Sequence, residues 1–345
     1  MRHIIIALLI AVATNVMAQE KKLKVYGIGF YNLENLFDTC HDEGKNDYEY
    51  LATGSNKWNA MKYKSKLGNM SRVLAEMGTD LLKNVGCAVI GVSEVENARA
   101  LSDLCAEPAL KARNFQFCHV EGPDRRGVDC ALLYNPKLFT PTDVHLYPYV
   151  QKLEKDSAFL TRGFLTVKGR IADEDIAVIV CHLPSRAATS FYREQGAEQV
   201  RHIKDSLIAA QPSLKVIVMG DMNDDPTDPS MAKSLRARKK ISDVKQGDMF
   251  NPWWKTLSDG NGTIKYDGGY NLFDQIILSP NLLCQDGKKD YSTLKYIKHQ
   301  IFQRSYMLQQ EGKNKGYPLR TFSGGMWMNG FSDHLPTIVY LVKQQ

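Results

Sequence analysis

The sequence of residues 216–226 is VIVMGDMNDDP, and this stretch decides how the fold is interpreted. Its first four residues are apolar and mostly β-branched, which predicts a buried strand. Three aspartates and one asparagine follow almost directly. Like charges placed side by side raise one another's pKa. The tip of this strand therefore needs a compensating partner from elsewhere in the chain.

Short apolar runs alternate with polar turns along most of the sequence. Helical periodicity is clearest in two segments, residues 62–77 and 192–210. Because several predicted strands follow one another with only a turn between them, we expect much antiparallel pairing in a mixed fold of helices and sheets. Residues 41–56 and 258–271 are expected to be long loops. The predicted strands are 25–32, 87–94, 127–135, 163–171, 175–182, 214–221, 272–279 and 337–342.

Most of these predicted strands adjoin a polar residue that can bind a metal or move a proton. For any one such residue, the common explanation is a turn former or a helix cap. Packed sheets bring neighbouring strand ends to one rim, however, so the whole set predicts a shared site. Its members are Asn32, Glu94, His182, Asp221, Asn223, Asp274, Asp333 and His334.

The carboxylates of this set predict a bound cation. If they converge, they cannot all stay ionised without positive charge among them. Carboxylate and amide oxygens are hard ligands that favour Mg²⁺, with Mn²⁺ or Ca²⁺ as alternatives, over zinc or copper. The two histidines change charge near neutral pH. A metal held by carboxylates beside imidazoles suits hydrolysis of a phosphate ester, because the metal offsets phosphoryl charge while a carboxylate or histidine activates water.

Six segments, taken in order, resemble the successive motifs of the endonuclease/exonuclease/phosphatase superfamily, which has the DNase I-like fold. The resemblance extends over the chain from about residue 24 to residue 342. It implies an α+β fold: a four-layer α/β/β/α sandwich of two mixed, largely antiparallel sheets, with helices outside and the active site at one rim. The segments are YNLEN (31–35), GVSEVEN (91–97), CHLPSR (181–186), GDMNDDP (220–226), FDQIILS (273–279) and FSDHLP (331–336).

The resemblance also implies a metal site in this chain. Glu94 matches the main metal carboxylate of the family, and Asn32 and Asp333 match the residues that complete or support the site. The implied cofactor is Mg²⁺, with Mn²⁺ or Ca²⁺ possible.

Five further positions match the catalytic residues of the family. His334 matches the general base or phosphate contact, and Asp274 resembles the aspartate that orients it. Asp221 would position or deprotonate the attacking water, while Asn223 would donate a hydrogen bond to the phosphoryl oxygens. His182 matches a second histidine found in DNase I-type, sphingomyelinase-type and inositol-phosphatase-type members. Abasic-site endonucleases have a different residue there, which argues against a DNA-repair role.

Substrate contacts are less well marked. An acidic residue before a strand partners the second histidine in DNase I-type members, and Asp129 is the nearest candidate, displaced by about one position. Neighbours on a strand point to opposite faces, so the pairing of Asp129 with His182 stays open. Arg126 and Arg162 are candidates for phosphate contacts, with solvated surface arginines as the alternative. Arg186 is a better candidate because it follows His182 closely.

The N-terminus predicts export. Residues 1–18 have a short basic start, an apolar stretch too short for the ~20 residues of a spanning helix, and small residues before a cleavage point near Ala18. We expect a cleaved signal peptide and a periplasmic or secreted protein, with residues 19–345 forming one domain. No stable membrane insertion and no protein partner are implied. Cys130 and Cys181, two of seven scattered cysteines, lie in apolar runs and are expected to be core residues.

The favoured hypothesis is therefore an exported, Mg²⁺-dependent phosphodiesterase that acts on a nucleic acid, either DNA or RNA. One alternative within the same enzyme class is a phosphoesterase for lipid or sugar phosphates, similar to sphingomyelinases or inositol phosphatases. A second alternative is a catalytically inactive binding protein on the same fold. Because every matched catalytic position carries a competent residue, the sequence favours an enzyme.

Overall fold

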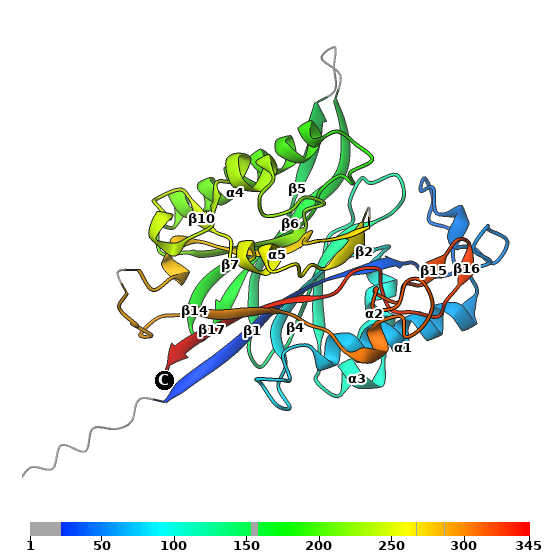
Figure 1. The fold of residues 1–345 in the computed structure, drawn as a ribbon, viewed down its shortest axis with the longest axis horizontal. Coiled ribbons are helices and arrows are strands. Elements are labelled where there is room, and N and C mark those ends of the chain that lie inside the picture. The colour runs from blue at the N-terminus through cyan, green and yellow to red at the C-terminus, as the bar shows by residue number, and fades with distance from the viewer. Residues whose placement is uncertain (1–21, 153–157, 267, 286) are drawn as a thin grey trace, which may run out of the picture.

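Two mixed β-sheets pack face to face in the computed structural model, which describes residues 22–152, 158–266, 268–285 and 287–345 (Figure 1). The predicted signal peptide, residues 1–18, lies outside the described residues. The first sheet has six strands in the order β14 (Lys295–Ile301), β17 (Thr337–Gln344), β1 (Leu23–Leu36), β2 (Cys87–Val95), β4 (Asp129–Tyr134) and β3 (Gln116–His119).

The second sheet has seven strands in the described part of the chain, and two short hairpins lie outside both sheets. The order in the second sheet is β5 (Thr140–Lys152), β6 (Ala158–Ile171), β7 (Glu174–His182), β8 (Lys215–Asp221), β13 (Asp274–Leu278), β10 (Met249–Phe250) and β9 (Ala237–Arg238). The hairpins are β11 (Ile264–Tyr266) with β12 (Gly269–Asn271), and β15 (Phe322–Ser323) with β16 (Met326–Trp327).

Helices cover the outer face of each sheet. In the described residues the α-helices are α1 (Ala60–Glu76), α2 (Ala98–Ala106), α3 (Pro108–Lys111), α4 (Ser190–Ala210) and α5 (Trp254–Ser258). The short 3₁₀ or π turns are η1 (Tyr48–Tyr50), η2 (Ser230–Ser234), η3 (Ile241–Asp243), η4 (Pro280–Leu282) and η5 (Ser305–Met307). Helices α1 to α3 lie on the first sheet and α4 lies on the second, so the molecule has the four predicted layers (Figure 1).

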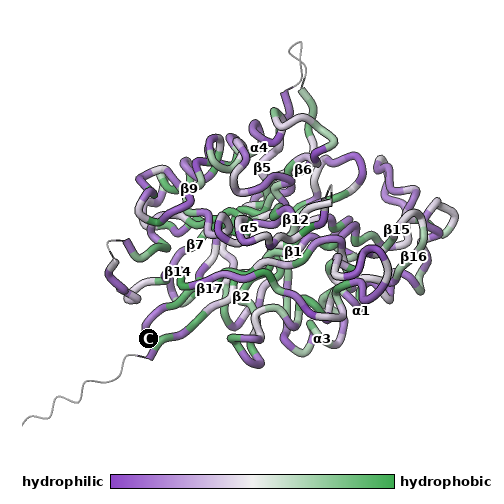
Figure 2. Tube along the Cα trace, viewed as in Figure 1, coloured by the Kyte–Doolittle hydropathy of each residue, from purple (hydrophilic) through white to green (hydrophobic). Residues whose placement is uncertain are grey.

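The side-chain alternation of β8 explains why the layers form. Ile217 and Met219 point between the sheets, whereas Val216 and Val218 point outward beneath α4. All four side chains are fully buried, as the apolar run predicts. Hydrophobic residues accordingly run through both sheets, while the outer loops are largely hydrophilic (Figure 2). The predicted α+β, DNase I-like architecture is confirmed.

The edges of the sheets were not predicted. Strands β5 and β14 lie at sheet edges and expose much of their surface, so neither has the continuous apolar pattern of a buried strand. The segment 258–271, expected to be a loop, also contains the β11–β12 hairpin. Each of the eight predicted strands and both predicted helices is present, with boundaries that differ by a few residues.

Two smaller observations complete the fold. Cys130 and Cys181 are buried and unpaired, as expected for core residues. Within the described ranges, the helices are all too short or too polar to cross a bilayer.

Candidate active site

The register of the strands brings the predicted polar residues to one rim. Strands β7 and β8 run parallel and place His182 beside Asp221. Strand β13 runs antiparallel to β8 and places Asp274 on the other side of Asp221. In the facing sheet, parallel β1 and β2 carry Asn32 and Glu94 to the same end. Asp221 therefore shares this rim with residues from four other strands.

Four side chains meet at the centre of this rim. The amide of Asn32 donates to Glu94 Oε1 at 3.2 Å and to Asp221 Oδ2 at 3.0 Å. His182 Nε2 lies 3.7 Å from the same Glu94 oxygen and 3.6 Å from the same Asp221 oxygen. Glu94, His182 and Asp221 thus offer three ligand atoms within 4.8 Å of one another. This group could hold a metal ion.

The backbone at Glu94 is strained, and a hydrogen bond fixes the position of its carboxylate. Glu94 has a φ of 61°, and the pairing of β2 with β4 shifts register between Ser93 and Val95. A positive φ is costly for a residue with a Cβ, and such strain occurs often at functional sites. The backbone N–H of Asn35 donates to Glu94 Oε2 at 3.0 Å and fixes the carboxylate. Asn223 also has a positive φ, of 50°.

A second group of contacts adjoins the first. His334 Nδ1 is 2.7 Å from Asp274 Oδ2, and His334 Nε2 is 3.7 Å from Asp221 Oδ2. The Ser332 hydroxyl accepts from the His334 backbone N–H and donates to the carbonyl of Asn32, which ties this loop to β1. His334 also forms a backbone bridge with Ile264 of the β11–β12 hairpin. The β11–β12 hairpin therefore helps to hold the backbone of His334 in place.

Burial and neighbouring charges shift the pKa values of the two histidines, His182 and His334, in opposite directions. Burial, the Arg162 and Arg126 guanidinium groups and His334 hold the pKa of His182 well below its usual value. Although burial lowers the pKa of His334, the carboxylates of Asp274 and Asp221 raise it well above its usual value. Burial and the Asp274 carboxylate raise the pKa of Asp221 to about 7, against the opposing effect of His334.

Asp333 lies beside His334, outside the group that Glu94 forms with His182 and Asp221. Its Oδ1 is 3.9 Å from His334 Nε2, and its Oδ2 accepts from Arg320 at 2.9 Å. Arg320 also donates to Glu34 Oε1 at 3.0 Å. Asp333 is thus paired with a guanidinium and is not one of the three clustered carboxylate and imidazole ligands. The sequence did not single out Arg320, because no motif surrounds it; Glu34 lies inside the YNLEN motif and could have been noted.

Asn223 lies close to the strand ends that carry His182 and Asp221. Its backbone N–H donates to Asp221 Oδ1 at 2.9 Å, and its amide donates to the Leu183 carbonyl at 2.9 Å. An amide nitrogen carries two N–H groups, so the bond to Leu183 uses only one of the two side-chain N–H groups of Asn223.

The three predicted substrate residues lie in different surroundings. Arg162 donates from Nη1 to the carbonyls of His182 and Leu183, so it packs against the end of β7 that carries His182. Arg186 is held by Asp225 and Asp228, at 3.1 and 2.9 Å from Nη2, and its network stabilises the loop after β8. These contacts account for Arg186 without a substrate.

Asp129 is engaged by residues other than His182. Its Oδ2 lies 3.1 Å from His119 Nε2, and both of its oxygens accept from the backbone N–H of Gly122. Together with Glu121, these two side chains form another group with metal-ligand spacing. His182 Nδ1 is buried and has no hydrogen-bond partner among the described residues. The partner of Asp129, His119, lies on β3 and no sequence motif indicated the pair.

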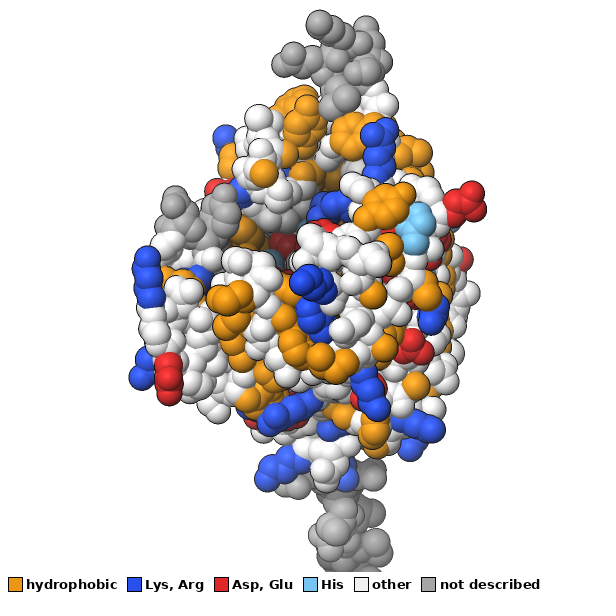
Figure 3. Space-filling view, turned by 90° about the vertical axis from the view of Figure 1, so that its right-hand side faces the viewer, with side chains coloured by type: hydrophobic (Ala, Val, Ile, Leu, Met, Phe, Trp, Pro, Cys, Tyr) orange, Lys and Arg blue, Asp and Glu red, His pale blue; other side chains and the backbone are white. Residues whose placement is uncertain are grey.

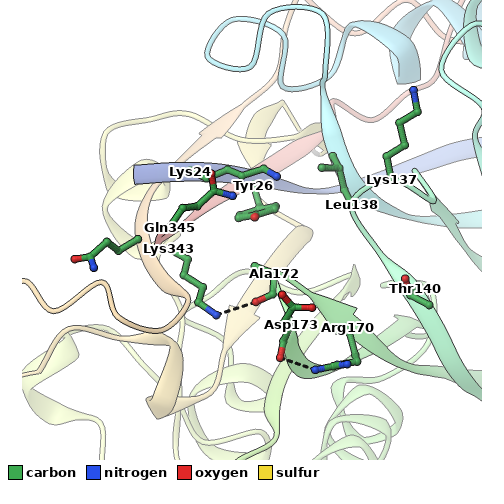
Figure 4. A pocket seen from close by; sticks show the side chains of 11 residues that line it. Lys24, Tyr26, Lys137, Leu138, Thr140, Arg170, Ala172, Asp173, Lys343 and Gln345 are labelled. Atoms are coloured by element: carbon green, nitrogen blue, oxygen red, sulfur yellow. Dashed lines mark hydrogen bonds between the residues drawn. The ribbon is translucent and has the colours of Figure 1, made fainter. Parts of the chain in front are cut away.

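The rim forms a hollow on the surface. Figure 3 shows acidic side chains recessed in it, with basic and hydrophobic side chains around the opening. The larger open cavities lie elsewhere. One, of about 560 Å³, lies where β1 begins and β6 ends, at the opposite end of the strands, and is lined by Lys24, Arg170, Lys343 and other residues (Figure 4). Arg170 and Lys343 are already paired within the chain. The chemistry-bearing residues therefore lie away from that cavity.

Comparison with known families agrees with this geometry. The sequence profile described as the Endonuclease/Exonuclease/phosphatase family matches residues 27–343. The chain belongs to this family. Members of the endonuclease/exonuclease/phosphatase family are phosphoesterases that depend on divalent metal ions. No curated protein sequence gives a significant match.

Several solved structures share the fold. An endonuclease/exonuclease/phosphatase family protein from Bacteroides thetaiotaomicron is 16% identical, with a TM-score of 0.56 over 94% of this chain and 100% of that one. A mannosyl-6-phosphatase from the same species is 15% identical, with a TM-score of 0.55 over 92% and 99%. TDP2 from D. rerio, complexed with a single-strand DNA product, is 13% identical, with a TM-score of 0.51 over 92% and 98%. These identities establish the shared fold alone.

Proposed function

We propose that this phosphoesterase is an Mg²⁺-dependent phosphodiesterase that hydrolyses a nucleic acid. The observation that carries the proposal is the convergence of Glu94, Asp221 and His182 within 4.8 Å, beside the His334–Asp274 pair. The set contains two imidazoles and three carboxylates from different parts of the chain, a combination suited to phosphate-ester hydrolysis. They supply the proton transfers and the charge stabilisation that cleavage of a phosphate ester requires.

The donor set fits a hard divalent cation. Glu94 and Asp221 present carboxylate oxygens that are bridged by the Asn32 amide, and oxygen ligands favour Mg²⁺, Mn²⁺ or Ca²⁺. Strong carboxylate charge at a buried rim also needs compensation. We assign Glu94 to the metal, with Asn32, whose amide N–H groups bridge Glu94 and Asp221, and Asp333 as the residues that complete or support the site. A bound cation there would offset charge on the phosphoryl oxygens.

The other residues at the rim have separate roles in proton transfer and in binding of the phosphoryl group. Asp274 fixes the tautomer and orientation of His334 through Nδ1, which leaves Nε2 directed toward Asp221. Asp221 orients the attacking water and accepts its proton. His182 acts as a neutral donor to the phosphoryl group. Asn223 donates its second amide N–H to an equatorial phosphoryl oxygen, where negative charge develops.

A nucleic acid is favoured as the substrate because cationic and aromatic side chains border the site. Arg126 lies close enough to His182 to lower its pKa, and its side chain is half exposed. Exposed Phe159 and Leu160 lie beside the same loop. Guanidinium groups next to an aromatic ring suit a backbone phosphate and its base. The likeness to a mannosyl-6-phosphatase makes a sugar phosphate the second candidate.

A substrate panel tests the proposal. Purified protein is assayed against single- and double-stranded DNA, RNA, bis-p-nitrophenyl phosphate, mannose 6-phosphate, phosphorylated inositols and sphingomyelin, with Mg²⁺, Mn²⁺, Ca²⁺ or EDTA. We expect Mg²⁺-dependent cleavage of an oligonucleotide. Hydrolysis of mannose 6-phosphate alone would show that the protein is a phosphomonoesterase and that the phosphodiesterase assignment is wrong. No hydrolysis of any substrate would leave the inactive binding protein as the better explanation.

We further propose that the enzyme is exported after removal of residues 1–18. A short apolar stretch followed by small residues at Val16 and Ala18 supports this proposal. N-terminal sequencing of the protein from fractionated cells tests it, with Gln19 expected as the first residue in a periplasmic or secreted fraction. An intact Met1 in the cytoplasmic fraction would contradict it.

A further inference from the structure

A pocket of about 350 Å³ opens between the loop at Asp124–Arg126 and the segment Phe159–Thr161 of β6. Its size falls within the range of about 300–1,000 Å³ typical of small-molecule sites. Phe159 and Leu160 are 39% and 49% exposed, which is high for large apolar side chains. The proposed reaction at the rim does not use them. They form an apolar wall that an incoming ligand could cover.

The floor of the pocket is fixed by one buried carboxylate. Asp124 accepts from the Thr161 hydroxyl at 3.0 Å and from the backbone N–H of Arg126 at 2.9 Å, and it lies 3.5 Å from Arg162 Nε. Its carbonyl oxygen accepts from Lys45 Nζ at 3.1 Å. These contacts join the loop to β6 and to the segment around residue 45. The pocket is therefore built into the fold rather than left between independent loops.

The same contacts connect the pocket with the catalytic rim. Arg162, which pairs with Asp124, donates to the carbonyls of His182 and Leu183. Arg126 and Arg162 both act electrostatically on His182. A ligand seated in the pocket thus lies next to the position expected for the scissile phosphate. A group joined directly to that phosphate could therefore occupy the pocket.

The chemistry of the walls selects the ligand. Arg125 and Arg126 are exposed at the opening, whereas the negative charge of Asp124 is buried and already paired. A flat aromatic ring beside guanidinium groups stacks well on a nucleobase, and the cations attract the adjoining phosphates. Stacking on Phe159 requires that the base leave any duplex.

We propose that this pocket, lined by Arg125, Arg126, Phe159 and Leu160, binds an unstacked nucleobase of a single strand, next to the phosphate that is cleaved. This inference rests on the proposed function and specifies its substrate as single-stranded or locally opened nucleic acid. Phe159 supplies the stacking face, and Arg126 contacts the neighbouring phosphate.

The test uses short single strands in which one nucleotide at a time lacks its base. The full-length mature enzyme is compared with Phe159→Ala and with Phe191→Ala, a matched variant of another exposed phenylalanine, 56% exposed and outside the pocket. In the unaltered enzyme, removal of one particular base should raise KM about tenfold. Phe159→Ala should raise KM for the intact strand by a similar factor, and removal of that base should then have little further effect. Phe191→Ala should retain the base dependence.

A binding measurement separates this inference from the proposed catalysis. Fluorescence anisotropy of labelled strands, intact or lacking one base, measures binding to the enzyme. EDTA is present so that no hydrolysis takes place. Base-dependent binding without turnover would support the pocket and refute the nuclease. Turnover with equal base dependence in Phe159→Ala and the unaltered enzyme would refute the pocket and keep the nuclease. An equal loss in Phe191→Ala would also overturn the proposal, because it would show a general effect of surface apolar residues.

A lipid is the competing ligand for an exposed Phe–Leu pair. Vesicles of sphingomyelin and phosphatidylserine are sedimented with the unaltered enzyme and with Phe159→Ala. If the variant loses vesicle binding while its KM for oligonucleotides stays that of the unaltered enzyme, the pocket serves a membrane surface and the nucleobase assignment is wrong. Absence of vesicle binding, together with the KM change above, supports the nucleobase.

Discussion

His334 Nδ1 lies 2.7 Å from Asp274 Oδ2, and both side chains are buried at the rim where the two sheets meet. The carboxylate holds the ring so that Nε2 points toward Asp221, 3.7 Å away. The three residues lie on β13, β8 and the loop before β17, so their alignment depends on the packing of both sheets. A proton can pass along this line only if the ring stays in that orientation.

Asp274→Asn is expected to lower kcat by about 10²- to 10⁴-fold. The amide keeps the shape of the side chain but no longer stabilises positive charge on His334 or fixes one tautomer. Steady-state kinetics on the best substrate of the panel, with thermal unfolding to check the fold, measure the effect. Asp259→Asn, at a surface carboxylate 48% exposed, serves as control. A kcat for Asp274→Asn equal to that of the control would remove the pair from the chemistry.

Glu94→Gln is expected to raise the Mg²⁺ concentration required for half-maximal activity by about tenfold or more. The substitution removes one of the two clustered carboxylates while preserving size, and affinity for hard cations depends on ligand charge. Calorimetric titration with Mn²⁺ measures the same loss without relying on turnover. Glu43→Gln makes the same carboxylate-to-amide change at an exposed position in the chain after β1. This control should leave metal affinity as it is. Equal Mn²⁺ affinity in both variants would contradict the metal assignment.

The sequence predicted the inner strands and the rim because both depend on local pattern. Buried strands such as β8 are continuous apolar runs, and a polar residue at the end of each run is visible without knowing the fold. Convergence then follows from sheet packing, since parallel strands such as β7 and β8 end at one edge. The edge strands β5 and β14 were missed because their exposed faces do not require apolar side chains.

Pairings between distant residues could not be predicted in this way. Arg320 contacts Glu34 across 286 positions of sequence, and the chemistry of either residue alone does not name its partner. Asp129 was considered beside His182, but the pairing of β3 with β4 brings His119 within 3.1 Å instead. Arg186 has a guanidinium suited to phosphate, yet the structure pairs it with Asp225 and Asp228 of the loop after β8. Side-chain partners depend on tertiary geometry, whereas strand ends depend on local pattern.

Acidification should destabilise the protein through His299. Burial lowers the pKa of His299 to about 4, while its value in the unfolded chain is 6.5. The unfolded state therefore binds a proton at a higher pH than the native state, and stability is lost as the pH falls from 6.5 toward 4. We expect a loss of about 2 kcal/mol from this residue over that interval.

Urea unfolding of the unaltered protein and of His299→Gln at pH 7 and pH 4.5 measures this contribution. The imidazole contacts Thr256 Oγ1 at 3.0 Å and the Tyr296 hydroxyl at 2.6 Å, so glutamine retains some hydrogen bonding but does not titrate. The variant should lose less free energy of unfolding on acidification. An identical pH dependence in the two proteins would show that His299 does not contribute to it.

Gly220→Ala should be strongly destabilising although it adds only a methyl group. A Cβ at this position would lie 2.0 Å from the carbonyl oxygen of Cys181 on the neighbouring strand β7. The clash is with backbone, so β7 and β8 must separate at the residues that place His182 beside Asp221. We expect a loss of about 2 kcal/mol or more, a fall in melting temperature of roughly 4 °C or more, and a loss of activity.

Gly68→Ala is the matched control, and the two substitutions should have opposite signs. Gly68 lies within α1, and a Cβ there would meet nothing within 4 Å. Alanine in a helix interior is favoured over glycine by roughly 0.5–1 kcal/mol, so this variant should be more stable and fully active. Calorimetry and activity assays on both variants make the comparison. A Gly220→Ala protein as stable and active as Gly68→Ala would mean that the β7–β8 junction tolerates a side chain, and that close approach of these strands does not set the spacing of the rim.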